Sequence, residues 1–239
     1  MSKIAIVTGG GSGGYGAGIA EALQRDGAKV WITGRTEETL KATAEELGCK
    51  YIVADVSSAA DWDRVFDTVL AEDGTVDFLI HNAGGGISKK HIDELSDEDI
   101  IQCINVNLTG VLLGSKRAAK VMKEKGTGTI VNISSVCAQQ SWPGWSAYSA
   151  AKGGLDRMTK CIYQELRPHG ARCTLVTPSW GQTKFQVAAD VPLHTDEVYE
   201  VVTKPIELGN LVSYVCNLPD HLWIQDVTLW PTVQNVMPL

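Results

Sequence analysis

A glycine-rich stretch near the N-terminus constrains the fold more than any other feature of this sequence. It runs over residues 9–18 and follows the short apolar run at residues 4–7. Glycines permit a positive φ and let the backbone approach a bound group closely. A helix that starts directly after such a loop directs free N–H groups and its positive dipole end at an anion. The stretch therefore predicts a strand, a phosphate-binding loop and a helix, in that order.

Short apolar runs alternate with helical patterns along the rest of the chain. The runs are almost continuously apolar, as in strands covered on both faces, and lie at residues 4–7, 30–32, 51–53, 78–80, 130–133, 173–176 and 227–229. Strands that alternate with helices form parallel βαβ units. We therefore predict an α/β fold with one domain over residues 1–239. Its core would be a Rossmann-type, doubly wound parallel sheet of about seven strands flanked by helices.

Composition argues against several classes of protein. The chain has 239 residues, 44% hydrophobic and 21% charged, which is ordinary globular usage. Its net charge of −7 argues against a nucleic-acid partner, because phosphate neutralisation needs clustered Lys and Arg. There is no membrane-length apolar run and no metal-ligand spacing among six cysteines and five histidines. The first residues have no apolar h-region, so we expect no signal peptide. We expect a cytoplasmic protein without a metal or a membrane partner.

Small or polar residues follow six of the predicted strands. They are Thr8 and Gly9, Gly34 and Arg35, Asp55, Asn82 to Gly84, Ser134 and Ser135, and Pro178 and Ser179. The carboxyl ends of parallel strands meet at one edge of a sheet, where ligands bind. These residues are therefore predicted to border a single site.

Arg35 stands where a dinucleotide site usually carries an acidic residue. The second strand ends in Thr33, Gly34 and Arg35, with no carboxylate to bind a ribose hydroxyl. A guanidinium can pair bidentately with a 2′-phosphate. The sequence therefore favours NADP(H) over NAD(H) as cofactor.

Tyr148 and Lys152 lie four residues apart on one face of a predicted helix. A tyrosine with a pKa of about 10 exchanges protons poorly at neutral pH, and lowering that pKa to about 7 requires roughly 4 kcal/mol. A nearby ammonium and an oxidised nicotinamide could supply this stabilisation. The Tyr–Lys spacing alone is common by chance. It indicates a catalytic site only together with Ser135, which could hydrogen-bond a substrate oxygen, and Asn107.

Together these residues resemble the short-chain dehydrogenase/reductase family in its compact, single-domain form. The resemblance covers about residues 4–229 and rests on the loop from Thr8 to Gly16, Asp55 and Val56, Asn82 to Gly84, Asn107, Ser135, Tyr148, Lys152, Pro178 and Thr183. It implies an oxidoreductase that transfers a hydride between a nicotinamide cofactor and a carbonyl/secondary-alcohol pair.

The resemblance also implies roles for individual residues. Tyr148 would be the general acid or base, Lys152 would lower its pKa and hold the nicotinamide ribose, Ser135 would orient the substrate, and Asn107 would hold a water that links Lys152 to solvent. The implied cofactor-binding residues are Gly9, Ser12, Gly14, Tyr15, Gly16, Arg35, Asp55, Val56, Asn82, Gly84, Tyr148, Lys152, Pro178, Gly181 and Thr183.

The sequence departs from the family pattern at several places, three of which lie near the predicted site. The loop has one extra residue between Gly9 and Gly14, His81 replaces the usual asparagine before Asn82, and Ser179 replaces the usual glycine after Pro178. We expect a structural role for His81.

Large aromatic residues surround the predicted site. Trp142 and Trp145 precede Tyr148, and Trp180 and Phe185 follow the sixth strand. They favour an apolar substrate, cyclic or aromatic. The apolar C-terminal tail, which includes Trp223, Trp230, Met237 and Leu239, is expected to pack on a neighbouring subunit of a homodimer or homotetramer.

Two other functions remain open. A dinucleotide-binding sensor or scaffold would keep the glycine loop but would not need Asn107, Ser135, Tyr148 and Lys152 together. A sugar epimerase or dehydratase can share the Tyr148 and Lys152 spacing, but such enzymes usually carry an extra substrate lobe, for which 239 residues leave little room.

Overall fold

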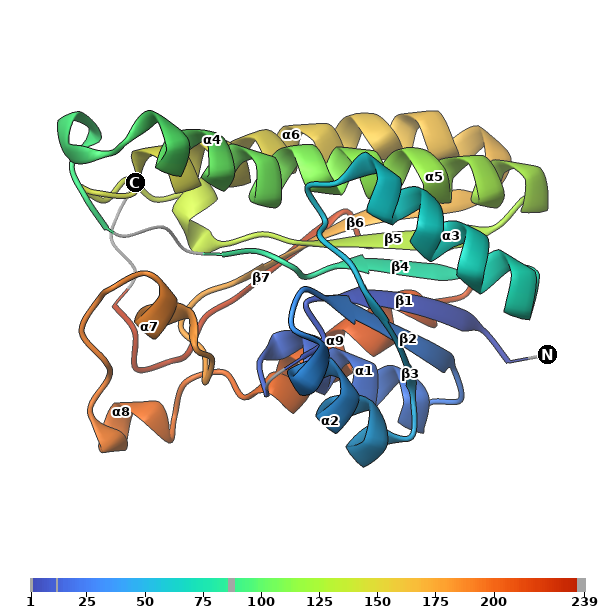
Figure 1. The fold of residues 1–239 in the computed structure, drawn as a ribbon, viewed down its shortest axis with the longest axis horizontal. Helices are drawn as coiled ribbons and strands as arrows, with labels where there is room; N and C mark the ends of the chain where they lie inside the picture. The colour runs from blue at the N-terminus through green and yellow to red at the C-terminus, as the bar shows by residue number, and fades with distance from the viewer. Residues whose placement is uncertain (1, 12, 86–88, 236–239) are drawn as a thin grey trace.

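A computed structural model describes residues 2–11, 13–85 and 89–235 of the chain. Seven parallel strands form one sheet in the order β3-β2-β1-β4-β5-β6-β7 (Figure 1). They are β1 (Ile4–Thr8), β2 (Lys29–Gly34), β3 (Lys50–Val53), β4 (Phe78–His81), β5 (Gly128–Ile133), β6 (Ala171–Pro178) and β7 (Asp226–Leu229). Each predicted strand is present, and the predicted fold class is confirmed. The order reverses between β1 and β4, which opens the crevice where ligands bind in such sheets.

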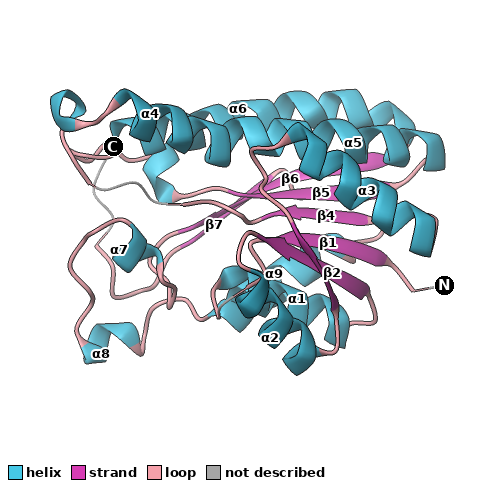
Figure 2. Ribbon diagram, in the orientation of Figure 1, coloured by secondary structure: helices cyan, strands magenta, loops and turns pink. Residues whose placement is uncertain are grey.

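Helices cover both faces of the sheet (Figure 2). One face carries α1 (Tyr15–Arg25), α2 (Glu37–Leu47) and α9 (Pro205–Cys216), and the other carries α3 (Ala59–Asp73), α4 (Asp97–Ile104), α5 (Gly110–Lys125) and α6 (Ser146–Leu166). Each face has its own apolar core. The short helices α7 (Phe185–Ala188) and α8 (Asp196–Tyr199) lie past the end of β6. No helix in the described part of the chain is both long and apolar enough to cross a membrane.

Two glycines let α1 and α9 pack backbone to backbone. A Cβ on Gly18 would overlap the backbone of Pro205, and a Cβ on Gly209 would overlap the carbonyl oxygen of Gly18. Because α1 begins directly after the glycine loop, this close packing fixes the position of the loop as well.

Trp223 packs within its own chain, and the expected contact of the tail with a neighbouring subunit stays a prediction. Its ring stacks on Tyr163 of α6 at an interplanar angle of 9°, and its Nε1 donates to the carbonyl of Cys173 at 3.0 Å. Met237 and Leu239, which belong to the same predicted contact, lie outside the described residues.

Candidate active site

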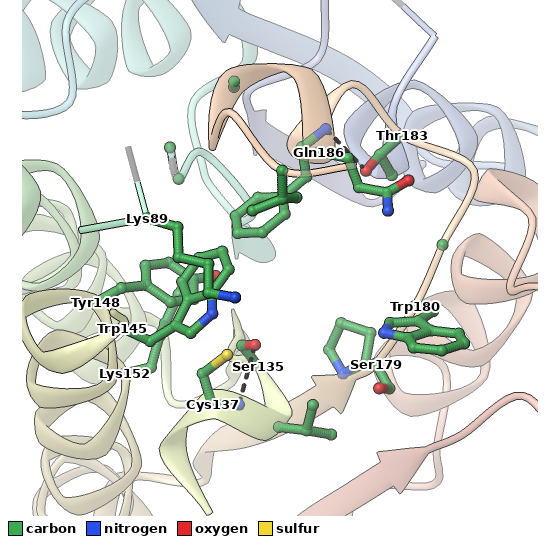
Figure 3. Close-up of a pocket in the computed structure, with 18 of the residues that line it drawn as sticks. Lys89, Ser135, Cys137, Trp145, Tyr148, Lys152, Ser179, Trp180, Thr183 and Gln186 are labelled. Carbon is green, nitrogen blue, oxygen red and sulfur yellow. Dashed lines mark hydrogen bonds between the residues drawn. The ribbon is translucent and has the colours of Figure 1, made fainter. Parts of the chain in front are cut away.

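A cleft of about 840 Å³ opens at the carboxyl ends of the strands (Figure 3). It brings together eleven of the predicted site residues: Gly9, Gly14, Tyr15, Asn82, Gly84, Ser135, Tyr148, Lys152, Pro178, Gly181 and Thr183. They come from the loops after β1, β4, β5 and β6, from the end of β6, and from α1 and α6. The glycine loop and the Tyr148 region therefore share one cavity.

The remaining predicted residues lie outside the cleft lining. Arg35 is exposed at the end of β2, and Asp55 and Val56 are half-buried after β3. The Asp55 carboxylate accepts hydrogen bonds from the backbone N–H (2.8 Å) and the hydroxyl (2.7 Å) of Ser57. Gly16 lies behind the loop, and Ser12 falls outside the described residues.

The glycine loop leaves the start of α1 free to bind an anion. Gly9 and Gly13 have φ of 69° and 67°, which favours glycine. Gly14 caps α1 without a side chain, and the first turn carries no acidic residue. A Cβ on Gly16 would overlap the carbonyl of Gly9. The backbone can therefore come close to a phosphate, with the helix dipole pointing at it.

Asn82 joins the ends of β1 and β4 at the floor of the cleft. Its side chain donates to the carbonyl of Thr8 at 2.9 Å, and the Thr8 hydroxyl accepts from the backbone N–H groups of Asn82 (3.0 Å) and Ala83 (2.8 Å). These bonds fix the two strand ends on which the loops are built.

His81 has the structural role that we expected. It is buried at the end of β4, where its Nε2 lies 3.1 Å from the hydroxyl of Ser115 and its ring packs edge-on against Trp62. Burial lowers the pKa of His81 to about 3, and the positive charge of Lys152 contributes to the shift. The imidazole is therefore neutral at physiological pH.

Tyr148 and Lys152 lie on the buried face of α6, as predicted. The Lys152 Nζ donates to the carbonyl of Ile133 at 2.9 Å and lies 5.7 Å from the centre of the Tyr148 ring. Ser135 follows β5, and its hydroxyl accepts from the N–H of Cys137 at 3.2 Å. Tyr148, Lys152 and Ser135 thus line the same cavity.

The protein groups alone do not lower the pKa of Tyr148. Burial raises that pKa above its ordinary value, the neighbouring Cys137 thiol adds to the rise, and the Ser135 hydroxyl opposes it. Burial also lowers the pKa of Lys152 to about 8. Burial of the phenol is the largest cause of the rise, and Lys152 directs its hydrogen bond to the carbonyl of Ile133.

Asn107 lies behind the cleft in a π-helical turn, Asn105–Thr109, between α4 and α5. It is fully buried and donates to the carbonyls of Cys103 (2.9 Å) and Gly85 (3.1 Å). Its Oδ1 accepts from no described residue. A Cβ on Gly84 would lie 2.9 Å from this oxygen and 3.5 Å from the Lys152 Nζ, so both atoms face Gly84. A buried acceptor of this kind suits an ordered water.

Three aromatic rings, Trp145, Tyr148 and Phe185, form what we call the aromatic cluster. Trp145 stacks on Phe185 with centroids 5.8 Å apart, and Tyr148 lies 5.8 Å from Trp145 and 5.5 Å from Phe185. Trp180 lies across the cleft and packs on His194 at 4.5 Å. Trp142 also lines the cavity, so all four predicted aromatic residues border it.

Several cleft residues were not predicted from the sequence: Lys89, Lys90, His91, Cys137, Lys184, Gln186, His194 and Gln234. Gln234 accepts a hydrogen bond of 2.6 Å from the Ser179 hydroxyl, across 55 positions of the chain. Of these residues, the basic run Lys89-Lys90-His91 is the one group that the sequence could have indicated as part of the site. The other residues reach the cleft through loops whose course local patterns do not determine.

The chain matches a known protein family over most of its length. The family model for short chain dehydrogenase matches residues 3–191. A 3-alpha-(or 20-beta)-hydroxysteroid dehydrogenase of Mycobacterium tuberculosis is 32% identical over 223 residues, which cover 91% of this chain and 83% of that protein.

Solved structures share the fold. An alcohol dehydrogenase from the archaeon Thermococcus sibiricus, complexed with 5-hydroxy-NADP, has a TM-score of 0.88 at 28% identity, over 100% of both chains. A 3-ketoacyl-(acyl-carrier-protein) reductase from Brucella melitensis, complexed with NADH, also has a TM-score of 0.88, at 27% identity over 96% of this chain and 97% of that one.

Proposed function

The chain belongs to the short-chain dehydrogenase/reductase family, and we propose that it transfers a hydride between NADP(H) and an apolar, cyclic or aromatic carbonyl/alcohol pair. As a family member it is an NAD(P)-dependent oxidoreductase that acts on CH–OH and C=O groups. The convergence of Ser135, Tyr148 and Lys152 in the cavity that also contains the glycine loop carries the proposal.

The residues around the cleft fit a nicotinamide dinucleotide. The loop from Gly9 to Gly16 and the N-terminus of α1, which has no side-chain cap and no acidic residue in its first turn, would hold the phosphates. Asp55 and Val56 would border the adenine, and Asn82 and Gly84 the central part of the cofactor. Pro178, Gly181 and Thr183 would contact the nicotinamide end. When bound, the nicotinamide gives or accepts the hydride.

Tyr148 would move the proton that accompanies this transfer. In reduction its hydroxyl donates a proton to the substrate oxygen, which Ser135 holds by a hydrogen bond; in oxidation the phenolate takes the proton back. The neutral phenol favoured by burial is the form needed for reduction. Lys152 and a water on the free Oδ1 of Asn107 would return protons from solvent.

The preference for NADP(H) is supported by Arg35. Its guanidinium is exposed at the end of β2, with no ion pair to a described carboxylate, and is available to a 2′-phosphate. Similar structures are complexed with NADP and its derivatives, whereas the Brucella melitensis reductase is complexed with NADH.

The apolar substrate is supported by the aromatic cluster, with Trp142 and Trp180. Together they offer flat apolar surfaces on two sides of the cleft (Figure 3). A substrate panel monitored by nicotinamide absorbance tests the whole proposal. Cyclic and aromatic ketones or alcohols should turn over faster than small polar ones, and the reverse order would contradict the substrate assignment.

The same panel separates the alternatives. A sensor or scaffold would bind the cofactor without turning over any carbonyl or alcohol, and a sugar epimerase or dehydratase would act on sugar nucleotides without net consumption of cofactor. The presence of Asn107, Ser135, Tyr148 and Lys152 around one cavity favours the oxidoreductase.

Homo-oligomerisation, a single-domain organisation and a cytoplasmic location stay predictions. Exposed apolar side chains support the first: Ile101 on α4 and Leu112 on α5 are 59% and 46% exposed. The continuous sheet from β1 to β7 supports the second. Light scattering of the purified protein tests the oligomer, for which a dimer or tetramer is expected.

A further inference from the structure

Positive charge concentrates around the cleft in a way that proton and hydride transfer do not require. Three lysines besides Lys152 line the cavity: Lys89, Lys90 and Lys184. None of the described residues that line it is Asp or Glu. The chain as a whole carries a net charge of −7, so the cleft is opposite in sign to the rest of the protein.

Lys89 is anchored to the wall of the cleft. Its backbone N–H donates to the carbonyl of Ala189, directly after α7, at 3.0 Å. A Cβ on Gly144 would lie 2.8 Å from the Lys89 Cγ, and Gly144 has a φ of 84° that disfavours a side chain there. Lys89 thus lies between the α7 segment and the residue before Trp145, on the same side of the cleft as the aromatic cluster (Figure 3).

The ammonium groups of this region have no carboxylate partner within the described chain. None of the ion pairs between described residues involves Lys89, Lys90 or Lys184. Both Lys89 and Lys90 are exposed at the cleft entrance. They are therefore available to an external anion and would attract one into the cleft.

The phosphates of the cofactor do not account for Lys89. The glycine loop and the N-terminus of α1 form their cradle, whereas Lys89 contacts Gly144 and the end of α7, which border the aromatic cluster. The positive charge of Lys89 at this wall could pair with one carboxylate of a ligand. The neighbouring aromatic rings could pack on an apolar part of the same ligand.

We propose that the substrate is an oxo acid or hydroxy acid, with a cyclic or aromatic body against the aromatic cluster and a carboxylate bound by Lys89. This inference rests on the proposed function and adds to it the chemical class of the substrate. A charge-assisted hydrogen bond of this kind favours the acid over its uncharged ester by about tenfold or more.

Two aryl oxo acids, benzoylformate and para-acetylbenzoate, and their methyl esters are the probes. The measured quantity is the ratio of kcat/KM for acid over ester, with NADPH. The wild type should prefer the acid. Lys89→Met should reduce the ratio about tenfold or more. If the Lys90 ammonium can bind the carboxylate in place of Lys89, the double variant Lys89→Met with Lys90→Met should show this reduction. Lys123→Met, at the exposed end of α5, is the matched control and should keep the wild-type ratio.

An unchanged ratio in both the single and the double variant would overturn the inference while the proposed reaction stands. Variants that change only the affinity for NADPH, and not the acid-over-ester ratio, would also overturn the inference. Binding is measured in parallel by the quenching of tryptophan fluorescence with NADP+ present. The wild type could bind the acids without turning over any probe, while Lys89→Met no longer binds them. That result would support the carboxylate site and overturn the proposed reaction.

Discussion

Tyr148 is the residue at which proton transfer can be separated from cofactor binding. We expect Tyr148→Phe to reduce kcat by about 100-fold or more, because the ring keeps its packing on Trp145 and Phe185 and loses only the hydroxyl. The dissociation constant of NADPH, measured by fluorescence titration, should change little. Tyr214→Phe, exposed on α9, is the control and should keep full activity. Turnover near the wild-type rate in Tyr148→Phe would rule out its role as the acid.

Arg35, at the end of β2, is the residue that tests the proposed preference for NADP(H). We expect Arg35→Asp to reduce the ratio of kcat/KM with NADPH over NADH by about tenfold or more, since a bidentate pair with the 2′-phosphate is replaced by repulsion. Steady-state kinetics with both cofactors measure the ratio. Arg167→Asp, exposed beyond α6, makes the same charge change away from the cofactor and should leave the ratio unaltered. An unchanged ratio in Arg35→Asp would refute the assignment.

At the scale of elements, the contact between α1 and α9 connects stability to cofactor binding. The Cβ of Gly209→Ala would overlap the carbonyl of Gly18 in α1, and a shift of α1 would move the glycine loop that precedes it. We expect a loss of about 2 kcal/mol or more in the free energy of unfolding, measured with urea, and weaker NADPH binding. Gly153→Ala, in α6 with open space around it, should be neutral or stabilising by up to about 1 kcal/mol. Equal stability of both variants would contradict this packing argument.

The elements differ in how far the sequence predicts them. The inner strands β2, β1, β4, β5 and β6 are largely buried on both faces, so their runs are mostly apolar and their positions follow from hydrophobicity. The edge strands β3 and β7 are mostly half-buried, yet they keep short apolar runs. The segment over α7 and α8 has no such pattern. It reaches the cleft by contacts such as the N–H of Lys89 with Ala189, which join residues 100 positions apart. The residues missed at the site come mainly from loops of this kind.

At the scale of the whole molecule, burial determines what the motif residues can do. The sequence places Tyr148 four residues before Lys152 and predicts a lowered tyrosine pKa from the adjacent charge. In the fold both groups are buried, and the cost of burying a charged group raises the pKa of Tyr148 and lowers that of Lys152. The spacing of two residues along the chain does not predict how deeply their side chains are buried, because burial depends on the packing of α6 against the sheet.

Burial of His81 gives the molecule a pH-dependent stability. The unfolded chain binds a proton at this histidine below about pH 6.5, whereas the folded protein excludes the proton until about pH 3. Stability contributed by this group is therefore complete above pH 6.5 and declines as the pH falls through that window. Between pH 7.5 and pH 5 the decline is about 2 kcal/mol.

Urea unfolding at pH 7.5 and pH 5 measures this decline. His81→Asn, which has no group that titrates in this range, should lose about 2 kcal/mol less than the wild type over the same interval, even if its absolute stability is lower. His221→Asn, at an exposed turn, should retain the wild-type dependence. A parallel pH dependence in wild type and His81→Asn would show that the folded protein takes up this proton, and would exclude the neutral, buried imidazole that joins β4 to α5.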